Sequence, residues 1–355
     1  MDGRPGKERN WHSKKRSSAT IYDIAKQTGV SKSTVSRVVN GDENVHPDTR
    51  ALVTKAINAL RFSPNSAARS LSNGTEARIG LVYANPSVSY FTELLMGALE
   101  SSSRNGAHLM VDRCEGRTLE DAYEVVRSLV KAGLSGIVLA TPLNEQHKLI
   151  KELADQGIAV VLIATGRFRS DISCVDIDNY KAAYEMTKYL IGLGHKKIGF
   201  VKGHPNITSS KLRYKGVMAA LRDAGSKIAK PVVVQGYNNY RSGLDAAEQI
   251  LSNKPDVTAI FANNDDMASA VMSLAHRKGM DVPQDLSVVG FDDTIAGMVW
   301  PELTTIRQHI ATIASTAVDM LLQDIRSSRS GIKPTSRNRL IDYTLVVRES
   351  AAAPR

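Results

Sequence analysis

Two pairs of adjacent carboxylates are the groups in this 355-residue sequence that most resemble catalytic or metal-binding residues. Asp265–Asp266 and Asp292–Asp293 each follow a short apolar run, and such pairs can bind a divalent cation or act as general acid and base. Neither pair has a histidine or cysteine at ligand spacing, and the glycines at 192 and 194 lack the third glycine of a dinucleotide-binding loop. No Walker loop, nucleophile elbow or H-E-x-x-H motif occurs. The sequence therefore predicts a protein that is not an enzyme and needs no metal or cofactor.

Some of the same side chains fit a binding site for a small molecule. Asn263, Asn264 and Asp265 follow an apolar run that ends at Phe261, and Asp292 follows another run. Ligands of open α/β sheets lie beyond the carboxyl ends of the strands. Arg213, near the start of a helical pattern, can clamp hydroxyls or a carboxylate. Together these residues predict a site for a polyol-like or acidic molecule.

A different polar surface is predicted near the N-terminus. The segment from Ile21 to Val38 has a helix start at Thr20, a turn at Gly29 and a second helix capped by Ser31. This pattern predicts a helix-turn-helix, whose second helix enters the major groove of DNA. The residues that remain on its outer face, which suit base edges and phosphates, are Lys32, Ser33, Thr34, Ser36 and Arg37.

The distribution of charge supports a nucleic-acid-binding head. Residues 1–75 contain 13 Lys and Arg against 6 Asp and Glu, which gives them +7 of the chain's net charge of +10. The remaining residues are almost neutral, as expected when one small domain contacts a phosphate backbone. We also expect part of the basic N-terminal stretch to be a solvated tail.

Behind the head, short apolar runs alternate with helical patterns. Runs at 79–83, 109–111, 137–140, 159–163, 198–201, 232–234, 259–261, 287–290, 304–306 and 340–345 read as strands. The helical patterns between them predict parallel sheets covered by helices on both faces. Because these strands are too many for one comfortable open sheet, two lobes with a cleft between them are expected.

The chain has no apolar run of about 20 residues, no secretory leader pattern and only two cysteines. These features predict a cytoplasmic protein without a membrane partner, and the predicted DNA-binding head adds the expectation that it is nucleoid-associated.

The sequence from Thr20 to Leu71 resembles the head and hinge of the lactose-repressor (LacI/GalR) family. In the body, GHKKIGFV at 194–201, ANNDDMASAVM at 262–272, DLSVVGFDD at 285–293 and LTTIRQ at 303–308 match the same family in its order. The resemblance covers about residues 20–348. It implies an all-α head, joined by a hinge helix to a two-lobed α/β core like that of periplasmic binding proteins.

The resemblance implies a domain division. We expect a disordered basic tail over 1–18, a helix-turn-helix domain over 19–63, a hinge over 64–76 and an effector-binding core over 77–350. Within the core, one subdomain is expected over about 77–177 and 307–339. The other is expected over about 178–304 and 340–350.

The resemblance also implies roles for individual residues. In the family, positions that match Lys32, Ser33 and Arg37 read a palindromic operator, a segment like 65–71 folds as a hinge helix, and a leucine like Leu71 wedges between base pairs. The full set expected to contact DNA is Thr20, Lys32, Ser33, Thr34, Ser36, Arg37, Asn40, Asn44, Thr49, Asn65, Arg69 and Leu71. His46 replaces the usual cap of the third helix, so a weaker cap is expected there.

For the core, the resemblance implies that positions like Arg213 and Asp265 contact the effector. The full set expected to contact it is Tyr90, Phe91, Arg167, Arg213, Asn238, Asn264, Asp265 and Asp292. Ala164 stands where the family often has an aspartate, and Arg167 lies close by in the sequence. We therefore include a sugar acid, besides a neutral sugar, as a possible effector.

The predicted function is a sequence-specific transcriptional regulator, by family default a repressor of carbohydrate-related genes. It would bind a palindromic operator as a homodimer and respond to a sugar or sugar acid in the core. A dimer is favoured over a tetramer because no heptad-patterned tail follows the last strand. A solute-binding protein of a transporter and a sugar-modifying enzyme are the alternatives.

Overall fold

The computed structural model describes residues 20–39, 45–60, 77–83, 87–113, 119–253 and 256–355. The chain divides into two compact units, Met1–Thr75 and Glu76–Arg355, which are described separately below. The predicted contacts at Asn40, Asn44, Asn65, Arg69 and Leu71 lie outside the described residues, as do the predicted hinge and tail.

The first unit contains α1 (Ile21–Thr28), α2 (Lys32–Val39) and α3 (Pro47–Ala59). α1 begins with a capping box in which the Thr20 side chain and Asp23 satisfy each other's backbone amides. Gly29 ends α1 at φ 69°, a left-handed conformation that glycine adopts without strain. The buried side chains that hold the three helices together are Ile24, Val35, Val38, Val45, Val53 and Ala56. α3 begins after His46, whose side chain makes no capping bond, as expected.

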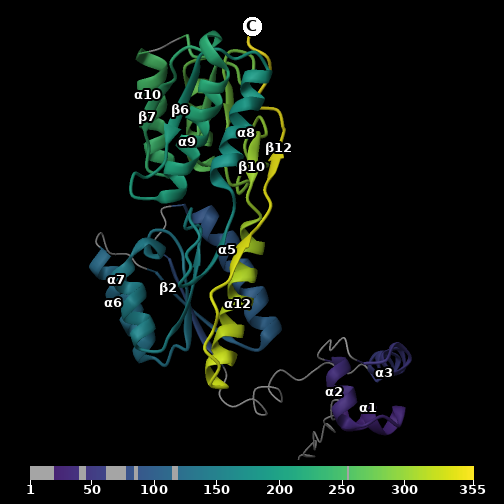
Figure 1. Ribbon diagram of the computed structural model, residues 1–355. Helices are drawn as coiled ribbons and strands as arrows, with labels where there is room; N and C mark the ends of the chain where they lie inside the picture. Colours follow the sequence, from purple (N-terminus) through teal and green to yellow (C-terminus); the bar gives the residue numbers. More distant parts are fainter. Residues whose placement is uncertain (1–19, 40–44, 61–76, 84–86, 114–118, 254–255) are drawn as a thin grey trace, which may run out of the picture. The chain divides into compact units, whose positions relative to one another are not determined.

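The second unit has two lobes (Figure 1). The first lobe contains a six-stranded parallel sheet in the order β11-β5-β4-β3-β1-β2. Its strands are β1 (Arg78–Tyr83), β2 (His108–Arg113), β3 (Gly136–Leu139), β4 (Ala159–Ile163), β5 (Ser173–Asp176) and β11 (Asn338–Leu340). The long helices α5 (Val88–Asn105) and α12 (Ile310–Arg329) cover one face, and α6 (Leu119–Lys131) and α7 (His147–Asp155) cover the other.

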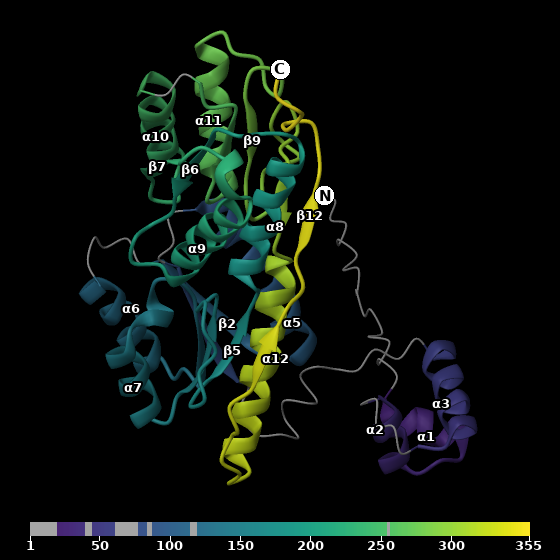
Figure 2. The same cartoon turned by 45° about the horizontal axis from the view of Figure 1, so that its top comes forward.

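The second lobe contains a four-stranded parallel sheet in the order β7-β6-β8-β9. Its strands are β6 (Ile198–Lys202), β7 (Val232–Gln235), β8 (Ala259–Ala262) and β9 (Ser287–Val289). α8 (Asn179–Gly192) and α9 (Thr208–Asp223) pack together on one side of this sheet, and α10 (Tyr240–Asn253) and α11 (Asp265–Arg277) on the other (Figure 2). β10 (Thr305–Arg307) pairs with β12 (Thr344–Val346) in a small antiparallel ribbon.

The chain passes between the lobes three times: from β5 to α8, from β10 to α12, and from β11 to β12. The third passage corrects a prediction, because the single strand expected over 340–345 is two short strands that belong to different sheets. Strand β5 was not predicted from the sequence. The two-lobe arrangement and the alternation of strands and helices agree with the predictions.

Candidate functional site

The outer face of α2 carries the side chains that the sequence assigned to DNA. Val35 and Val38 point into the core of the head, which leaves Lys32, Ser33 and Arg37 exposed. At the N-terminal end of α2, the Ser31 hydroxyl accepts from the Thr34 amide at 3.2 Å. This hydrogen bond caps the N-terminal end of α2. In helix-turn-helix proteins this end of the second helix approaches the base edges.

Lys32 has an aromatic neighbour that the sequence analysis did not single out. Its Nζ lies 4.6 Å from the ring centre of Tyr22, and the Tyr22 side chain is 59% exposed. This ring restricts where the lysine charge is presented. An exposed aromatic residue in the first turn of α1 was the signal that could have identified it.

Thr20 and Thr49 contribute to the head in a different way. The Thr20 hydroxyl donates to Asp23 at 2.7 Å, so it is occupied by the capping box of α1. Thr49 is half-buried in the first turn of α3. Their contact with DNA stays a prediction.

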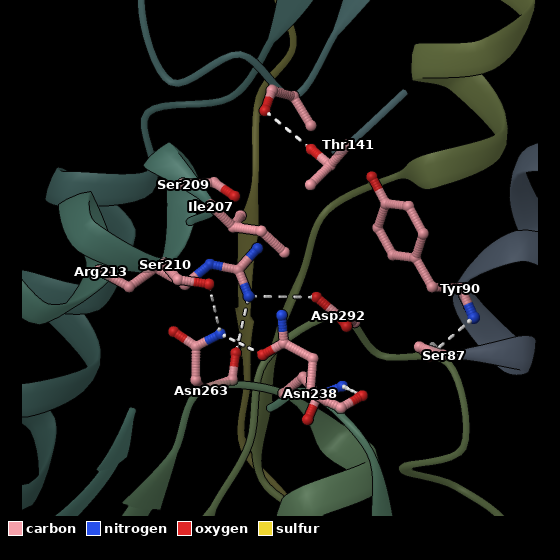
Figure 3. A pocket seen from close by; sticks show the side chains of 12 residues that line it. Ser87, Tyr90, Thr141, Ile207, Ser209, Ser210, Arg213, Asn238, Asn263 and Asp292 are labelled. Atoms are coloured by element: carbon pink, nitrogen blue, oxygen red, sulfur yellow. Dashed lines mark hydrogen bonds and ion pairs between the residues drawn. The ribbon is translucent and has the colours of Figure 1, made fainter. Parts of the chain in front are cut away.

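In the second unit, a polar cavity lies between the two lobes (Figure 3). The empty space within it, with the open solvent at its mouth included, is about 390 Å³. Its walls consist of Ser87, Tyr90, Thr141, Ala164, Ile207, Ser209, Ser210, Arg213, Asn238, Asn263, Asn264 and Asp292. The first four come from the first lobe and the others from the second, so a molecule bound here would contact both lobes.

Arg213, on α9, is the centre of the polar network. Its Nε donates to Asn179 Oδ1 at 2.9 Å, and its Nη1 donates to the backbone oxygen of Asn263 at 2.7 Å. The guanidinium carbon lies 3.6 Å from the ring centre of Phe291, which supports one face of the group. Figure 3 shows the second terminal nitrogen turned toward the open part of the cavity. The arginine is therefore fixed in position with one edge available to a ligand.

Asp292 supplies the opposite charge. Its Oδ1 lies 3.4 Å from Arg213 Nη1 and also accepts from the side-chain amide of Gln308. Burial raises the pKa of the Asp292 carboxyl to about 7, and the neighbouring Asp266 adds to the rise while Arg213 opposes it. Burial likewise lowers the pKa of Arg213. The pair thus places one cation and one titratable carboxylate in the same wall.

Three asparagines form the floor of the cavity. Asn263 Nδ2 donates to Asn238 Oδ1 at 3.0 Å and to Ser210 Oγ at 3.3 Å, and Asn264 Nδ2 donates to the Asn238 carbonyl at 3.2 Å. A side chain at Gly203 would collide with this group, because a Cβ there would lie 2.3 Å from Asn263 Nδ2. Asn263 Oδ1 is buried and accepts no hydrogen bond from the described residues. It is a ready acceptor for a ligand hydroxyl.

Backbone strain is concentrated at this site. Ala164, Asn238 and Asp292 have φ values of 53°, 59° and 118°, which non-glycine residues rarely adopt. All three line the cavity. Such strain persists only where the surrounding structure fixes it, and it is frequent at ligand-binding sites.

Three of the residues assigned to the effector lie elsewhere. The Asp265 carboxylate accepts from the Thr305 hydroxyl at 2.6 Å and from the Thr294 amide at 2.9 Å, and it does not line the cavity. Arg167 is exposed, and Phe91 packs partly buried against the main hydrophobic core; neither lines the cavity. The structure therefore brings together Tyr90, Arg213, Asn238, Asn264 and Asp292, but not these three.

The small residues of the wall were missed by the effector-site prediction. These residues come from segments far apart in the sequence and are Ser87, Thr141, Ser209 and Ser210. Ser87 caps α5 by accepting from the Tyr90 amide at 3.3 Å, a signal that sequence alone could have given. The others carry no local pattern that separates them from ordinary surface residues.

Among the described residues, no group of three or more His, Cys, Asp or Glu side chains is placed to hold a metal ion. No helix in the described part of the chain is both long and apolar enough to cross a membrane.

Two family descriptions match the chain. Residues 20–65 match "Bacterial regulatory proteins, lacI family", and residues 76–345 match "Periplasmic binding proteins and sugar binding domain of LacI family". The match over the head contradicts the alternative of a transporter's solute-binding protein without DNA function.

Curated relatives are regulators as well. Catabolite control protein A of Priestia megaterium is 33% identical over 306 residues, which cover 85% of this chain and 91% of that protein. The HTH-type transcriptional repressor PurR of Pasteurella multocida (strain Pm70) is 32% identical over 308 residues, covering 86% and 92%. These relatives agree with the prediction that the chain is not an enzyme.

Solved structures are similar to this chain over nearly its full length. The lac repressor dimer bound to operator and the anti-inducer ONPF has a TM-score of 0.70 at 28% identity, covering 94% of this chain and 99% of that chain. A complex of the transcriptional regulator CelR with cellobiose has a TM-score of 0.69 at 27% identity, with the same coverage. With its helix-turn-helix head and two-lobed effector-binding core, this chain is a DNA-binding transcriptional regulator that belongs to the LacI family.

Proposed function

We propose that this protein is a repressor that binds a palindromic operator as a dimer and is controlled by a small, neutral, sugar-like effector in the cavity of its core. The observation that carries the proposal is the buried Arg213–Asp292 pair in a polar cavity shared by both lobes. A molecule rich in hydroxyls can accept from the arginine and donate to the carboxylate at once. The CelR–cellobiose complex, a structural neighbour, supports a sugar.

A neutral effector is favoured over a sugar acid by the charges of the wall. Among the described residues of the cavity wall, Arg213 is the one cation, and Asp292 lies beside it. Arg167, which would have supplied a second positive charge, is exposed and outside the wall. A ligand carboxylate would therefore have to compete with Asp292 for the same guanidinium.

The dimer is supported by large apolar side chains left exposed in the second unit. Met298 and Trp300 are 85% and 84% exposed, and Met96 and Leu99 of α5 are 58% and 43% exposed. Exposed apolar residues that cluster, as Met298 and Trp300 do in one short segment, are typical of surfaces that another protein covers. The lac repressor neighbour is a dimer.

Trp300→Asp should shift the protein from dimer toward monomer in light scattering, whereas Ile332→Asp, at another exposed apolar position, should not.

We further infer that the protein acts in the cytoplasm, where a bacterial regulator meets the nucleoid. This inference rests on the family's DNA-binding role.

The effector proposal is tested by a thermal-shift panel of neutral sugars, sugar acids, sugar phosphates and purines. A neutral sugar at 100 times its Kd should add about 2.7 kcal/mol of stability. Arg213→Lys, which keeps the charge beside Asp292 but loses the planar fork, should remove most of the shift. Arg222→Ala, on the exposed face of the same helix, is the matched control. Binding of sugar acids alone, or an unchanged shift in Arg213→Lys, would contradict the proposal.

The DNA proposal is tested by selecting sequences from random DNA and measuring affinity by fluorescence anisotropy. The selected site should be palindromic, and log Kd should change with log salt by about 0.9 per phosphate neutralised. Lys32→Ala and Arg37→Ala should weaken binding by about 1–3 kcal/mol each, whereas Lys55→Ala on α3 is the control. Equal affinity for unrelated DNA would contradict sequence-specific binding.

A further inference from the structure

The N-terminus of α9 is capped by a residue of the opposite lobe. Its own N-cap position is Ile207, which has no polar side chain and makes no capping bond. The amide of Thr208, the first residue of α9, donates instead to Glu145 Oε1 at 2.6 Å. Glu145 ends a short 3-10 turn, Leu143–Glu145, in the first lobe. A hydrogen bond that normally closes within one helix here joins the two lobes.

The chemistry of the contact favours the charged side chain. The first amides of a helix have no partner inside the helix, and the aligned peptide dipoles place partial positive charge at that end. A carboxylate there forms a charge-assisted hydrogen bond. If the lobes separated, Glu145 and the Thr208 amide would lose each other and be solvated by water. The contact therefore stabilises the closed arrangement relative to an open one.

The helix that Glu145 holds is the one that presents the cavity wall. Ile207, Ser209, Ser210 and Arg213 all line the cavity and lie at or within the first turns of α9 (Figure 3). The contact therefore acts on the effector site through the position of α9, without a side chain of Glu145 in the cavity wall itself.

The lobes are closely packed beside this contact. A Cβ on Gly166 of the first lobe would lie 2.8 Å from Leu212 Cδ1 and 2.9 Å from Thr208 Cγ2. A second polar contact joins the lobes where Ser89 Oγ of α5 donates to Asp266 Oδ1 of α11 at 3.3 Å. The longer distance makes this the weaker of the two hydrogen bonds.

We propose that Glu145 is a positioning residue that latches the two lobes in the closed arrangement and so sets the affinity of the core for its effector. The proposal rests on the proposed function, because it assumes that the closed cavity is the ligand-binding form. Affinity is reduced in proportion to the fraction of molecules that are not binding-competent. Removing the latch lowers the closed fraction and weakens effector binding without touching a cavity residue.

Two substitutions remove the contact from opposite sides. Glu145→Ala deletes the acceptor, and Thr208→Pro deletes the donor. Proline is favourable at the first position of a helix, and Ile207, at φ −107° and ψ 118°, has the extended backbone that a following proline requires. Glu145→Gln keeps an uncharged acceptor for the Thr208 amide and should therefore retain part of the stabilisation of the closed arrangement. Asp155→Ala, which removes an exposed carboxylate of α7 in the same lobe, is the matched control.

The first measurement needs no ligand. Hydrogen exchange of the ligand-free protein, read by mass spectrometry over the first turn of α9, reports how often the Thr208 amide loses its partner. Glu145→Ala should speed exchange there by about three- to tenfold, and Glu145→Gln by less, with Asp155→Ala unchanged. Exchange that is unchanged in Glu145→Ala would overturn the latch, whatever the cavity binds.

The second measurement uses D-glucose, cellobiose and D-gluconate as probes, by calorimetric titration. For a probe that binds the wild type, Kd should rise about three- to tenfold in Glu145→Ala and in Thr208→Pro, and the double variant should be no weaker than the worse single one. Additive losses would overturn the coupling of the two residues. Wild-type protein that binds none of the probes would count against the proposed function, while hydrogen exchange would still decide the latch.

Discussion

At the scale of single residues, the titration of Asp292 gives the first prediction. Its carboxyl has a pKa raised to about 7 by burial. Hydroxyl donors of a sugar bind the ionised form, so protonation competes with the effector. As pH falls through this range, affinity should fall, reaching up to about tenfold weaker binding at pH 6 than at pH 8. Titration calorimetry at both pH values measures the difference.

Asp292→Asn provides the control for that titration. The amide cannot ionise, so binding should be weaker at every pH but independent of pH between 6 and 8. A pH dependence that survives in Asp292→Asn would assign the titration to another group.

The residue scale also shows where sequence reasoning stops. Asp265 and Asp292 look alike in the sequence, since each follows a short strand with a second aspartate beside it. The structure separates them because Thr305 and Thr294 occupy the oxygens of Asp265, whereas Asp292 pairs with Arg213 in the cavity wall. Partners that lie tens of residues away in the chain decide the role, and no local pattern records them.

At the scale of elements, the crossing of α5 and α12 predicts that a glycine-to-alanine substitution destabilises the protein, which is the opposite of what helix propensity alone predicts. A Cβ on Gly97 of α5 would lie 2.0 Å from the backbone oxygen of Ala311 of α12. Gly97→Ala should therefore destabilise the protein by about 1–3 kcal/mol through overpacking, although alanine is the better helix former. Chemical denaturation of the purified variant measures the loss.

Gly192→Ala is the matched substitution for this test. Gly192 is the last residue of α8, and an added Cβ would have no neighbour within 4 Å. Alanine there should be neutral or should stabilise the protein by up to about 1 kcal/mol. Equal changes of stability in the two variants would mean that the close approach of α5 and α12 does not require Gly97.

A buried histidine beneath the segment that follows β12 gives a pH-dependent prediction. His195 Nε2 donates to the Ala352 carbonyl at 2.9 Å, Nδ1 lies 2.9 Å from the Thr258 hydroxyl, and burial lowers the pKa of the ring. In the unfolded chain the ring has its ordinary pKa, near 6.5. The unfolded chain therefore takes up the proton first, so stability is full above about pH 6.5 and is lost as pH falls below it.

Urea denaturation at pH 7.5 and 5.5 tests this sign. His195→Gln retains a donor for Ala352 but does not titrate, so acidification should lower the wild-type midpoint relative to that of His195→Gln. The exposed His276→Gln should behave as the wild type. The raised pKa of Asp292 makes the folded state take up a proton over the same pH range, which opposes the effect of His195 in both proteins. An equal change of midpoint in the wild type and in His195→Gln would refute the assignment.

Most elements could be predicted because apolar runs and helical patterns alternate clearly along the core. The exceptions have physical reasons. β5 is four residues long and begins and ends with the polar Ser173 and Asp176, so it lacks a continuous apolar run. β11 and β12 read as one strand because Leu340, Ile341 and Leu345 are apolar, whereas the chain leaves one sheet for another between them.

At the scale of the whole molecule, the two units should respond to different ligands. Among the described residues, six buried apolar side chains hold the head together, whereas the core has three larger clusters, so the head should unfold at the lower temperature. Scanning calorimetry should show two transitions. A bound sugar should raise only the upper one and operator DNA chiefly the lower one. A single transition that a sugar shifts as a whole would mean that the units unfold together.

The three passages of the chain between the lobes also determine the order in which the head and the lobes are completed during synthesis. The head is complete once Ala59 has left the ribosome, but the first lobe lacks α12 and its edge strand β11 until Leu340 has followed. At about 5–20 residues per second, the interval is roughly 15–55 s. Each new molecule therefore completes its DNA-binding head before its effector-binding core. Regulation by the effector begins only when translation is nearly over.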